Sequence, residues 1–278
     1  MALKTTSGSG SVSSINKKGD WLNSFIEERQ QIVDGLDYKK DLILGKAGTG
    51  KTTFASTFPN WLFLDFDKNM RVIPDAERRR KYRIPFERGD DIESMVKDIF
   101  QSFTEKDGPF AEGGIFSDVE TIVIDSIHKM SDWMLFYIVK NILKKNPKKD
   151  KPGFDGYNQL KGSWSELVEV MKDAPCHIVA LSGVRTYEKE NEGTIEIQPM
   201  IEGAYRDMIA HEFGEVYYFD RESKGFGVKS TVDYVGYTNI YKNINMLKTT
   251  HKFSDGSGLP YMFKNPTFDK LYTEGVFE

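Results

Sequence analysis

The sequence predicts an α/β fold in which helices cover both faces of a mainly parallel central sheet. Two observations predict this class. A glycine-rich loop, residues 45–52, stands between an apolar strand signal and a helix signal. Two later apolar runs, residues 61–67 and 121–126, each carry an aspartate at or near their end. Buried strands that alternate with helices are typical of parallel sheets, because each crossover between parallel strands needs a long connection, usually a helix.

The first predicted unit is a strand, a loop and a helix. Residues 41–44 form a short buried strand, and residues 51–58 form a helix that Pro59 halts. The loop between them has the spacing of a phosphate-binding loop, which Thr53 follows: Gly45-Lys46-Ala47-Gly48-Thr49-Gly50-Lys51-Thr52. The order of strand, loop and helix is the context that such a loop requires.

Each residue type in this phosphate loop suits a nucleoside triphosphate. Glycines let backbone N–H groups turn toward phosphate oxygens. Lys51 supplies a positive charge at the β- and γ-phosphates, and the Thr52 hydroxyl is a ligand for Mg²⁺. The helix that follows directs its positive end at the same anion. The sequence therefore predicts that residues 45–53 bind ATP together with Mg²⁺.

The next two strands end in carboxylates. Residues 61–67 form a strand with acids at its end, and residues 121–126 form a fully apolar strand that ends at Asp125. Ligands bind at the carboxyl edge of such sheets, so Asp125 is expected to hold Mg²⁺ beside Thr52. Helices are expected over residues 90–106 and 127–143, and an arginine-rich connection (Arg71, Arg78, Arg79, Arg80, Arg83) follows the first of these strands.

The densest positive run leads into a segment with two aromatic residues, at 152–157. Two interpretations stay open for it. Lysines suit the solvated, negative end of a helix. A mobile basic loop with aromatic residues could instead follow phosphates and stack on bases. The lysines of this run are Lys140, Lys144, Lys145, Lys148, Lys149 and Lys151.

The remaining elements complete the predicted sheet. A helix marked by Trp164 and Leu167 precedes a buried strand at 177–182, and residues 183–201 form a long, hairpin-like loop. A helix at 202–213, a strand at 215–220 and short strands with loops follow. The predicted division is a flexible arm at 1–20, a core at 21–225 and a β-rich extension at 226–278 packed on the core. The core opens with an amphipathic pattern at 21–33 that predicts a short helix or a docking segment.

Composition excludes several classes of protein. The single cysteine, Cys176, excludes an internal disulfide framework and a cysteine-rich zinc site. The four histidines are too dispersed in sequence to indicate a metal site, and they read as structural. No apolar run is long enough to span a bilayer, so we expect a soluble, cytoplasmic protein without a membrane partner. A formal net charge of −4 argues against a globally basic nucleic-acid coat.

The order of these motifs resembles the RecA-like P-loop NTPase core. More specifically, the chain is similar to the compact RecA-like ATPases of phage genomes, the Sak-type single-strand annealing or recombination proteins. The likeness covers roughly residues 40–220, and the matching stretches are 44–53, 62–67, 121–126, 157–161, 175–182 and 215–219. Its specificity lies mainly in the first and third of these stretches.

The resemblance implies roles for further residues. Lys51 and Asp67 are the implied catalytic residues, with Asp67 polarising the attacking water where the family usually has glutamate. Ser182 takes the position of a γ-phosphate sensor. A neighbouring subunit would supply cations to the site, for which Arg185, Lys189 and Arg206 are the candidates. The candidate DNA loops are residues 183–199 and the segment with Lys144, Lys145, Lys148, Lys149 and Lys151.

Three functions follow as hypotheses. The preferred one is an ATPase that binds single-stranded DNA in recombination, in a bacterial host cytoplasm if the chain is phage-encoded. Its partners would be further copies of itself in a ring or filament, and a single-strand DNA-binding protein. The alternatives are a small-molecule kinase with an arginine-rich lid at 71–83 and a nucleotide-gated scaffold with little turnover.

Overall fold

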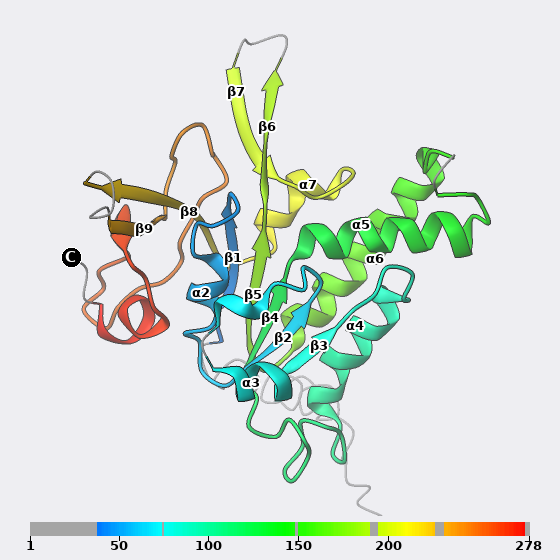
Figure 1. Ribbon diagram of the computed structural model, residues 1–278, viewed down its shortest axis with the longest axis horizontal. Helices are drawn as coiled ribbons and strands as arrows, with labels where there is room; N and C mark the ends of the chain where they lie inside the picture. Colours follow the sequence, from blue (N-terminus) through cyan, green and yellow to red (C-terminus); the bar gives the residue numbers. More distant parts are fainter. Residues whose placement is uncertain (1–37, 74, 148–149, 190–193, 226–230, 276–278) are drawn as a thin grey trace, which may run out of the picture. The chain divides into compact units, whose positions relative to one another are not determined.

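The computed structural model describes residues 38–73, 75–147, 150–189, 194–225 and 231–275 (Figure 1). The predicted arm at 1–20 and the amphipathic segment at 21–33 lie outside the described residues. In the part described, no helix has the length and apolar character needed to cross a membrane.

An eight-stranded sheet forms the centre of the unit that begins at Tyr38. Its six parallel strands run in the order β8 (Glu215–Lys224), β1 (Lys40–Gly45), β5 (His177–Ser182), β4 (Thr121–Asp125), β2 (Trp61–Asp65) and β3 (Arg83–Pro85). Two antiparallel strands, β9 (Thr231–Tyr237) and β10 (Met262–Lys264), continue the sheet beyond β8. The predicted α/β class with a mainly parallel sheet is confirmed.

The register brings the carboxyl ends of the central strands to one edge. Gly45 pairs with Phe219 of β8, and Leu44 pairs with Ser182 of β5. Asp65 of β2 pairs with Asp125 of β4. Because β5 separates β1 from β4, the phosphate loop and Asp125 face each other across one intervening strand. Residues that are far apart in the sequence therefore meet at a single edge.

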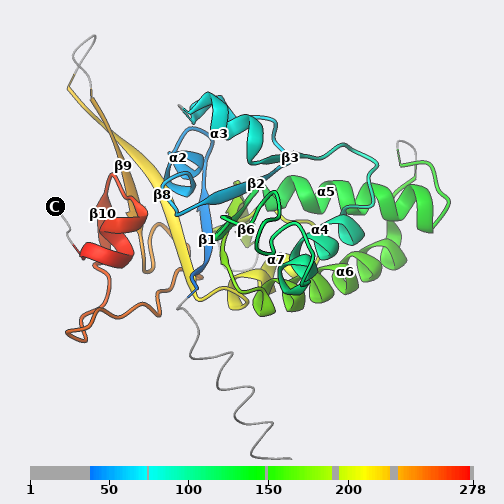
Figure 2. The same cartoon turned by 90° about the horizontal axis from the view of Figure 1, so that it is seen from below.

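Helices cover both faces of this sheet, as side-chain alternation along β5 shows. The His177 ring packs against Phe58, just after α2 (Lys51–Ala55), and against Phe268 at the start of η6 (Asp269–Glu274). Ile178, which points to the other face, lies beside Val168 and Met171 of α6 (Gly153–Asp173). The helices α4 (Ile92–Gln101) and α5 (Ile127–Tyr137) contact α6 on that second face (Figure 2).

The central strands are buried from end to end because both of their faces are covered. Every residue of β2 and β4 is buried, and so are residues 41–45 of β1. This explains their continuous apolar runs, which contrast with the alternating pattern of a half-exposed strand. The buried Asp41 carboxylate accepts a 2.6 Å hydrogen bond from the Tyr272 hydroxyl, which ties η6 to β1.

Several predicted helix boundaries were wrong. The helix after the phosphate loop ends at Ala55 rather than residue 58, because backbone turns close over residues 56–58. The helix at 90–106 is α4 followed by the 3-10 turn η2 (Ser102–Thr104), and the helix at 127–143 is α5 followed by η3 (Ile138–Ile142). The helix at 202–213 shortens to α7 (Tyr205–Met208) and η4 (Ile209–His211).

Two segments considered as loops have regular structure: the first is helical, and the second, predicted as hairpin-like, is a β-hairpin. Residues 153–157 begin α6, because Gly156 and Leu160 continue the buried face that Trp164 and Leu167 mark. The loop at 183–201 is a two-stranded hairpin of β6 (Val184–Lys189) and β7 (Thr194–Pro199). The strand predicted to end at residue 220 extends to Lys224 because β9 pairs with its second half. Short helices η1 (Met70–Val72) and α3 (Ala76–Lys81) connect β2 to β3.

Candidate nucleotide site

The phosphate loop joins β1 to α2 by a path that only glycine permits at two positions. Gly50 precedes α2 with a φ of 84°, in the left-handed region that other residues avoid. A Cβ on Gly45 would lie 2.5 Å from the carbonyl oxygen of Phe219 in β8. The loop therefore lies directly on the neighbouring strand, with its backbone N–H groups close to the start of the helix.

The Lys51 side chain folds back over this loop. Its Nζ donates hydrogen bonds of 2.8 Å to the carbonyl oxygens of Gly45 and Lys46. Burial lowers the pKa of Lys51, while the carboxylates of Asp125 and Asp67 oppose that shift. A partly buried ammonium group that has neutral carbonyl partners gains strongly from an anion placed in the loop.

The predicted Mg²⁺ ligands contact each other. The Thr52 hydroxyl donates a 2.9 Å hydrogen bond to Oδ2 of Asp125, which joins the first turn of α2 to the end of β4. The pKa of Asp125 is raised to about 6, mainly by burial and also by the nearby Asp67 and Asp65, while the Thr52 hydrogen bond and Lys51 act in the opposite direction. A cation at this position would offset the carboxylate charge that burial disfavours.

Two acids follow one another at the end of the β2 run, and the structure separates their roles. Asp65 is fully buried and forms a 2.6 Å ion pair with Nε of Arg83. Asp67 lies just beyond the strand, where its Oδ2 accepts a 3.1 Å hydrogen bond from the Ser126 hydroxyl. The predicted catalytic carboxylate is therefore beside Asp125, whereas Asp65 serves the structure of the sheet.

Sequence reasoning did not connect His128 with this site. Its Nε2 lies 3.4 Å from the Ser126 hydroxyl, and its Nδ1 accepts a 3.3 Å hydrogen bond from the Gly183 backbone N–H. Burial lowers the pKa of His128, against the opposing charge of Asp67. Its position three residues after Asp125, in the first turn of the helix that follows that strand, was the available signal.

The donor set suits Mg²⁺ bound together with a nucleotide. Thr52 and Asp125 supply hard oxygen ligands, which Mg²⁺ prefers. Within the described ranges, no group of three or more His, Cys, Asp or Glu residues could hold a metal ion alone. Mg²⁺ sites of one or two protein ligands are completed by phosphate oxygens and water, and this geometry fits that arrangement.

Comparison with known proteins gives the family. A model of the AAA_24 family, described as an AAA domain, matches residues 37–254. The chain belongs to the AAA_24 family. The matched range contains the phosphate loop, Asp67 and Asp125, together with every strand except β10. The family match, together with the phosphate loop between β1 and α2 of a mainly parallel sheet, supports a P-loop fold and the nucleotide-binding ATPase class.

Among solved structures, two to which the chain is similar have low sequence identity to it. The RadB recombinase has a TM-score of 0.43 and 11% identity, over 81% of this chain and 86% of its own. The KaiC-like protein PH0186 from the hyperthermophilic archaeon Pyrococcus horikoshii OT3 has a TM-score of 0.41 and 12% identity, over 78% of this chain and 83% of its own. Among curated proteins, none matches the chain.

The resemblance also assigned roles to Ser182, Arg185, Lys189 and Arg206. Some of them lie around the nucleotide site of this AAA_24 domain, and others lie away from it. Ser182 closes β5 at the same edge, but it is fully buried and its hydroxyl donates to the Gly183 carbonyl oxygen at 2.9 Å. Arg185 lies 3.6 Å from a Glu202 carboxylate oxygen. Arg206 pairs with Asp207 at 3.1 Å and lies over the Tyr187 ring. Lys189 ends β6, and its side chain lies outside the described part.

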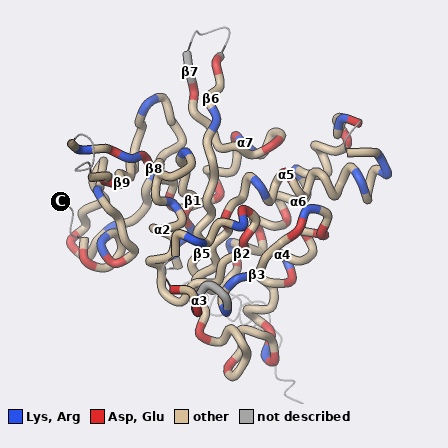
Figure 3. The backbone as a smooth tube through the Cα atoms, viewed as in Figure 1, with Lys and Arg blue, Asp and Glu red and all other residues tan. Residues whose placement is uncertain are grey.

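The lysine segment projects from a different place than the β6–β7 hairpin. Lys144, Lys145 and Lys151 are exposed where η3 leads into α6, and Figure 3 shows this basic cluster well away from the hairpin. The reason is that α5 and η3 carry the chain away from the sheet edge before it reaches these lysines. Lys148 and Lys149 lie outside the described residues.

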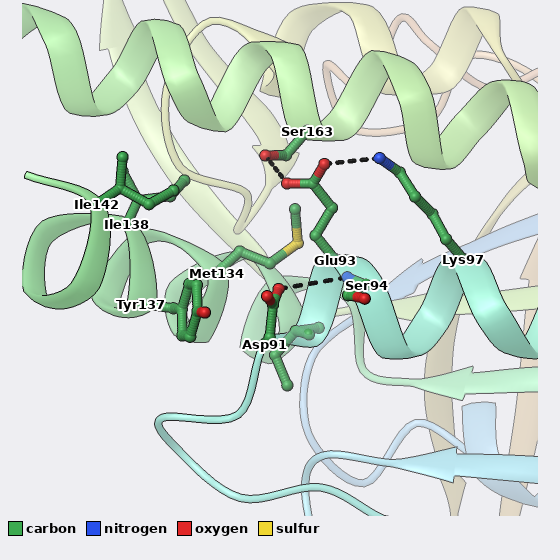
Figure 4. Close-up of a pocket in the computed structure, with 10 residues that line it drawn as sticks. Asp91, Glu93, Ser94, Lys97, Met134, Tyr137, Ile138, Ile142 and Ser163 are labelled. Atoms are coloured by element: carbon green, nitrogen blue, oxygen red, sulfur yellow. Dashed lines mark hydrogen bonds and ion pairs between the residues drawn. The ribbon is translucent and has the colours of Figure 1, made fainter.

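A separate cavity of about 260 Å³ lies among α4, α5, η3 and α6 (Figure 4). The Glu93 carboxylate in its wall contacts both Ser163 and Lys97, and Asp91 accepts a 3.3 Å hydrogen bond from the Ser94 backbone N–H. None of the predicted site residues lines this cavity, and these polar groups already have partners. The nucleotide site is therefore the open edge at the phosphate loop rather than this cavity.

Proposed function

We propose that this protein is an ATPase whose nucleotide state controls its binding to single-stranded DNA, in recombination or annealing of the phage Sak type. One observation carries the ATPase part of the proposal. Lys51, the Thr52–Asp125 pair and Asp67 come from three separate elements and converge at one sheet edge. A cluster of charged residues can also be purely structural, but such a cluster would not require a glycine-rich phosphate loop beside it.

The arrangement gives each group a distinct role in phosphoryl transfer. Lys51 exchanges its carbonyl partners for β- and γ-phosphate oxygens, and Thr52 with Asp125 would hold Mg²⁺, which neutralises phosphate charge when bound. Asp67 uses one carboxylate oxygen for the Ser126 hydroxyl, which leaves the other to accept a proton from the attacking water. Because Asp67 is shorter than the glutamate usual at this position, we expect slow turnover.

The β6–β7 hairpin supports the DNA part of the proposal. It begins two residues after Ser182, at the same edge as the nucleotide site, and His128 contacts its base through Gly183. Its Tyr187 side chain is 48% exposed, with the Arg206 guanidinium 5.8 Å from the ring centroid. An exposed ring beside a cation suits a stacked base and its phosphate.

A subunit interface is part of this proposal. The Arg185 ion pair is long and the Arg206 pair is with its sequence neighbour, so exchanging either for a phosphate in a second subunit costs little. We infer assembly into a ring or filament with Mg·ATP at or near the contact, and a single-strand DNA-binding protein as a further partner. Sizing the protein with ATP, with ADP and with ATP plus DNA tests this directly.

Two residues of the arginine-rich segment disfavour the kinase alternative. Arg83 is committed to the buried Asp65, and the Arg78 guanidinium lies 4.8 Å from the centroid of the Trp61 ring and 5.2 Å from that of Tyr82. Arginines in such packed positions are poor candidates for a lid that opens onto an acceptor. A nucleotide-gated scaffold remains the second candidate because Asp67 departs from glutamate.

DNA binding is tested by fluorescence anisotropy of a labelled oligothymidine at low salt, with a slowly hydrolysed ATP analogue, with ADP and without nucleotide. We expect the tightest binding with the analogue, a fall in affinity as salt rises, and no nucleotide effect in Lys51→Ala. Tyr187→Ala should weaken binding by about tenfold, whereas Tyr261→Ala, an exposed tyrosine near β10, should not. Absence of binding in every nucleotide state would contradict the DNA role.

A further inference from the structure

Two residues outside the predicted site lie directly against the phosphate loop. A Cβ on Gly50 would lie 2.8 Å from Cγ and Cδ1 of the Tyr234 ring in β9. A Cβ on Gly48 would lie 3.6 Å from Nη1 of Arg221 in β8. The ring and the guanidinium therefore approach the loop at two of its glycines, from strands that follow it by more than a hundred residues in the sequence.

The β8–β9 pairing explains why these two side chains lie together. Arg221 and Tyr234 are direct cross-strand partners, so their side chains share one face of the sheet. Two residues earlier in β8, the Phe219 ring packs 5.1 Å from the Phe54 ring of α2. Because side chains alternate along a strand, Arg221 points to the face that carries α2 and the phosphate loop.

The Arg221 guanidinium is available to a ligand, and the backbone that carries the Tyr234 ring is held in place. No described residue forms an ion pair with the Arg221 guanidinium, and its side chain is exposed. The Tyr234 backbone is held by Asn265. The Tyr234 N–H donates a 2.9 Å hydrogen bond to Oδ1 of Asn265, and the Tyr234 carbonyl oxygen accepts one of 2.7 Å from the Asn265 backbone N–H. The two paired strands thus present a flat ring from β9 and a guanidinium from β8 to the loop.

We propose that Arg221 and Tyr234 form a second wall of the nucleotide site, in which Arg221 binds triphosphate oxygens and Tyr234 packs against the nucleoside. A planar guanidinium matches phosphate oxygens, and a ring stacks on any base because every base has a π-face. The triphosphate tail would lie between Lys51 and Arg221. This inference rests on the proposed nucleotide site and adds a contact from the same subunit to it.

The test compares two ligands by isothermal titration calorimetry: Mg·ATP, and Mg·tripolyphosphate, which has no nucleoside. Arg221→Ala should weaken both ligands by about tenfold, because a charge-assisted hydrogen bond to phosphate is lost. Tyr234→Ala should weaken ATP by about tenfold and leave tripolyphosphate unchanged. Tyr234→Phe should bind both ligands as the unmodified protein does.

Lys224→Ala is the matched control for Arg221→Ala. Lys224 lies on the same strand but on the opposite face, where it pairs with Asp233 at 2.6 Å. Lys224→Ala removes the same charge as Arg221→Ala without affecting the loop, so its affinities for ATP and tripolyphosphate should not change. If Tyr234→Ala fails to fold, Tyr234→Leu replaces it, because leucine keeps an apolar contact on Gly50 without the flat ring. Tyr234→Leu should weaken the binding of ATP and leave that of tripolyphosphate unchanged.

Three results would overturn the wall. They are unchanged ATP affinity in Arg221→Ala, an equal loss in Lys224→Ala, and loss of tripolyphosphate binding in a folded Tyr234→Ala, which would make the ring a support for the loop. Failure of the unmodified protein to bind either ligand would instead contradict the proposed nucleotide site. If the unmodified protein binds and no substitution at Arg221 or Tyr234 changes the affinity, the proposed nucleotide site stands and only the proposed wall is wrong.

Discussion

The Thr52 hydroxyl donates a 2.9 Å hydrogen bond to Oδ2 of Asp125. This contact links the helix that follows the phosphate loop to a strand two positions away in the sheet. One Mg²⁺ ion bound here could coordinate the Thr52 hydroxyl and neutralise the charge of the Asp125 carboxylate. The site is thus assembled before any ligand binds, at the cost of a buried carboxylate.

That cost predicts a pH-dependent gain in stability for Asp125→Asn. The pKa of Asp125 is raised from 3.8 to about 6, so the folded protein takes up a proton in this window that the unfolded chain does not. The free energy of unfolding without ligand therefore falls as pH rises through this window. In EDTA, Asp125→Asn should be more stable than the unmodified protein by about 2 kcal/mol above pH 6 and equally stable near pH 4.

Urea unfolding at the two pH values measures this difference. Asp107→Asn is the control, because Asp107 is exposed and distant in sequence from the site. A gain of the same size at both pH values would show that the substitution acts through packing rather than through ionisation of Asp125. The variant should also lose Mg²⁺-dependent hydrolysis, since an amide is a poor ligand for Mg²⁺.

Asp67 is predicted to serve catalysis more than binding. Asp67→Ala should lower kcat for ATP hydrolysis by at least about 100-fold and change KM by less than about threefold, because a general base contributes mainly in the transition state. Asp67→Glu, which restores the residue usual in RecA-like enzymes, should retain or raise kcat. Unchanged kcat in Asp67→Ala would assign the attacking water to another group.

Arg83 is predicted to stabilise the fold rather than bind an acceptor. Arg83→Ala leaves the fully buried Asp65 carboxylate without its ion pair, and it should lower the free energy of unfolding by about 3 kcal/mol. Lys172→Ala, which breaks a surface pair with Glu212, should cost less than about 1 kcal/mol. ADP release that depends on an added small-molecule acceptor, and that Arg83→Ala abolishes, would instead favour a kinase.

The sequence was sufficient to predict the centre of the fold. The strands that carry the phosphate loop, Asp67 and Asp125 are buried on both faces, so their apolar runs are continuous and easily found. The start of α6 was missed because Gly153 and Gly156 are typical of loops, and only the helix packed in three dimensions shows that Gly156 lies on its buried face.

Contacts between distant segments could not be predicted. Arg221 and Tyr234 follow the phosphate loop by long stretches of sequence, and nothing near them marks a nucleotide site. The pairing of β8 with β9, and the position of β8 beside β1, bring them to Gly48 and Gly50. His128 was taken for a structural histidine, because its neighbours Ser126 and Gly183 come from different turns at the sheet edge.

The most direct test of the account is equilibrium binding of Mg·ATP to Lys51→Ala, measured by isothermal titration calorimetry beside Lys172→Ala, whose lysine lies on α6. The account predicts that Lys51→Ala weakens ATP binding by at least about 100-fold and abolishes hydrolysis, while Lys172→Ala matches the unmodified protein. A folded Lys51→Ala variant with unchanged ATP affinity and turnover would contradict the assignment of residues 45–52 as the nucleotide site.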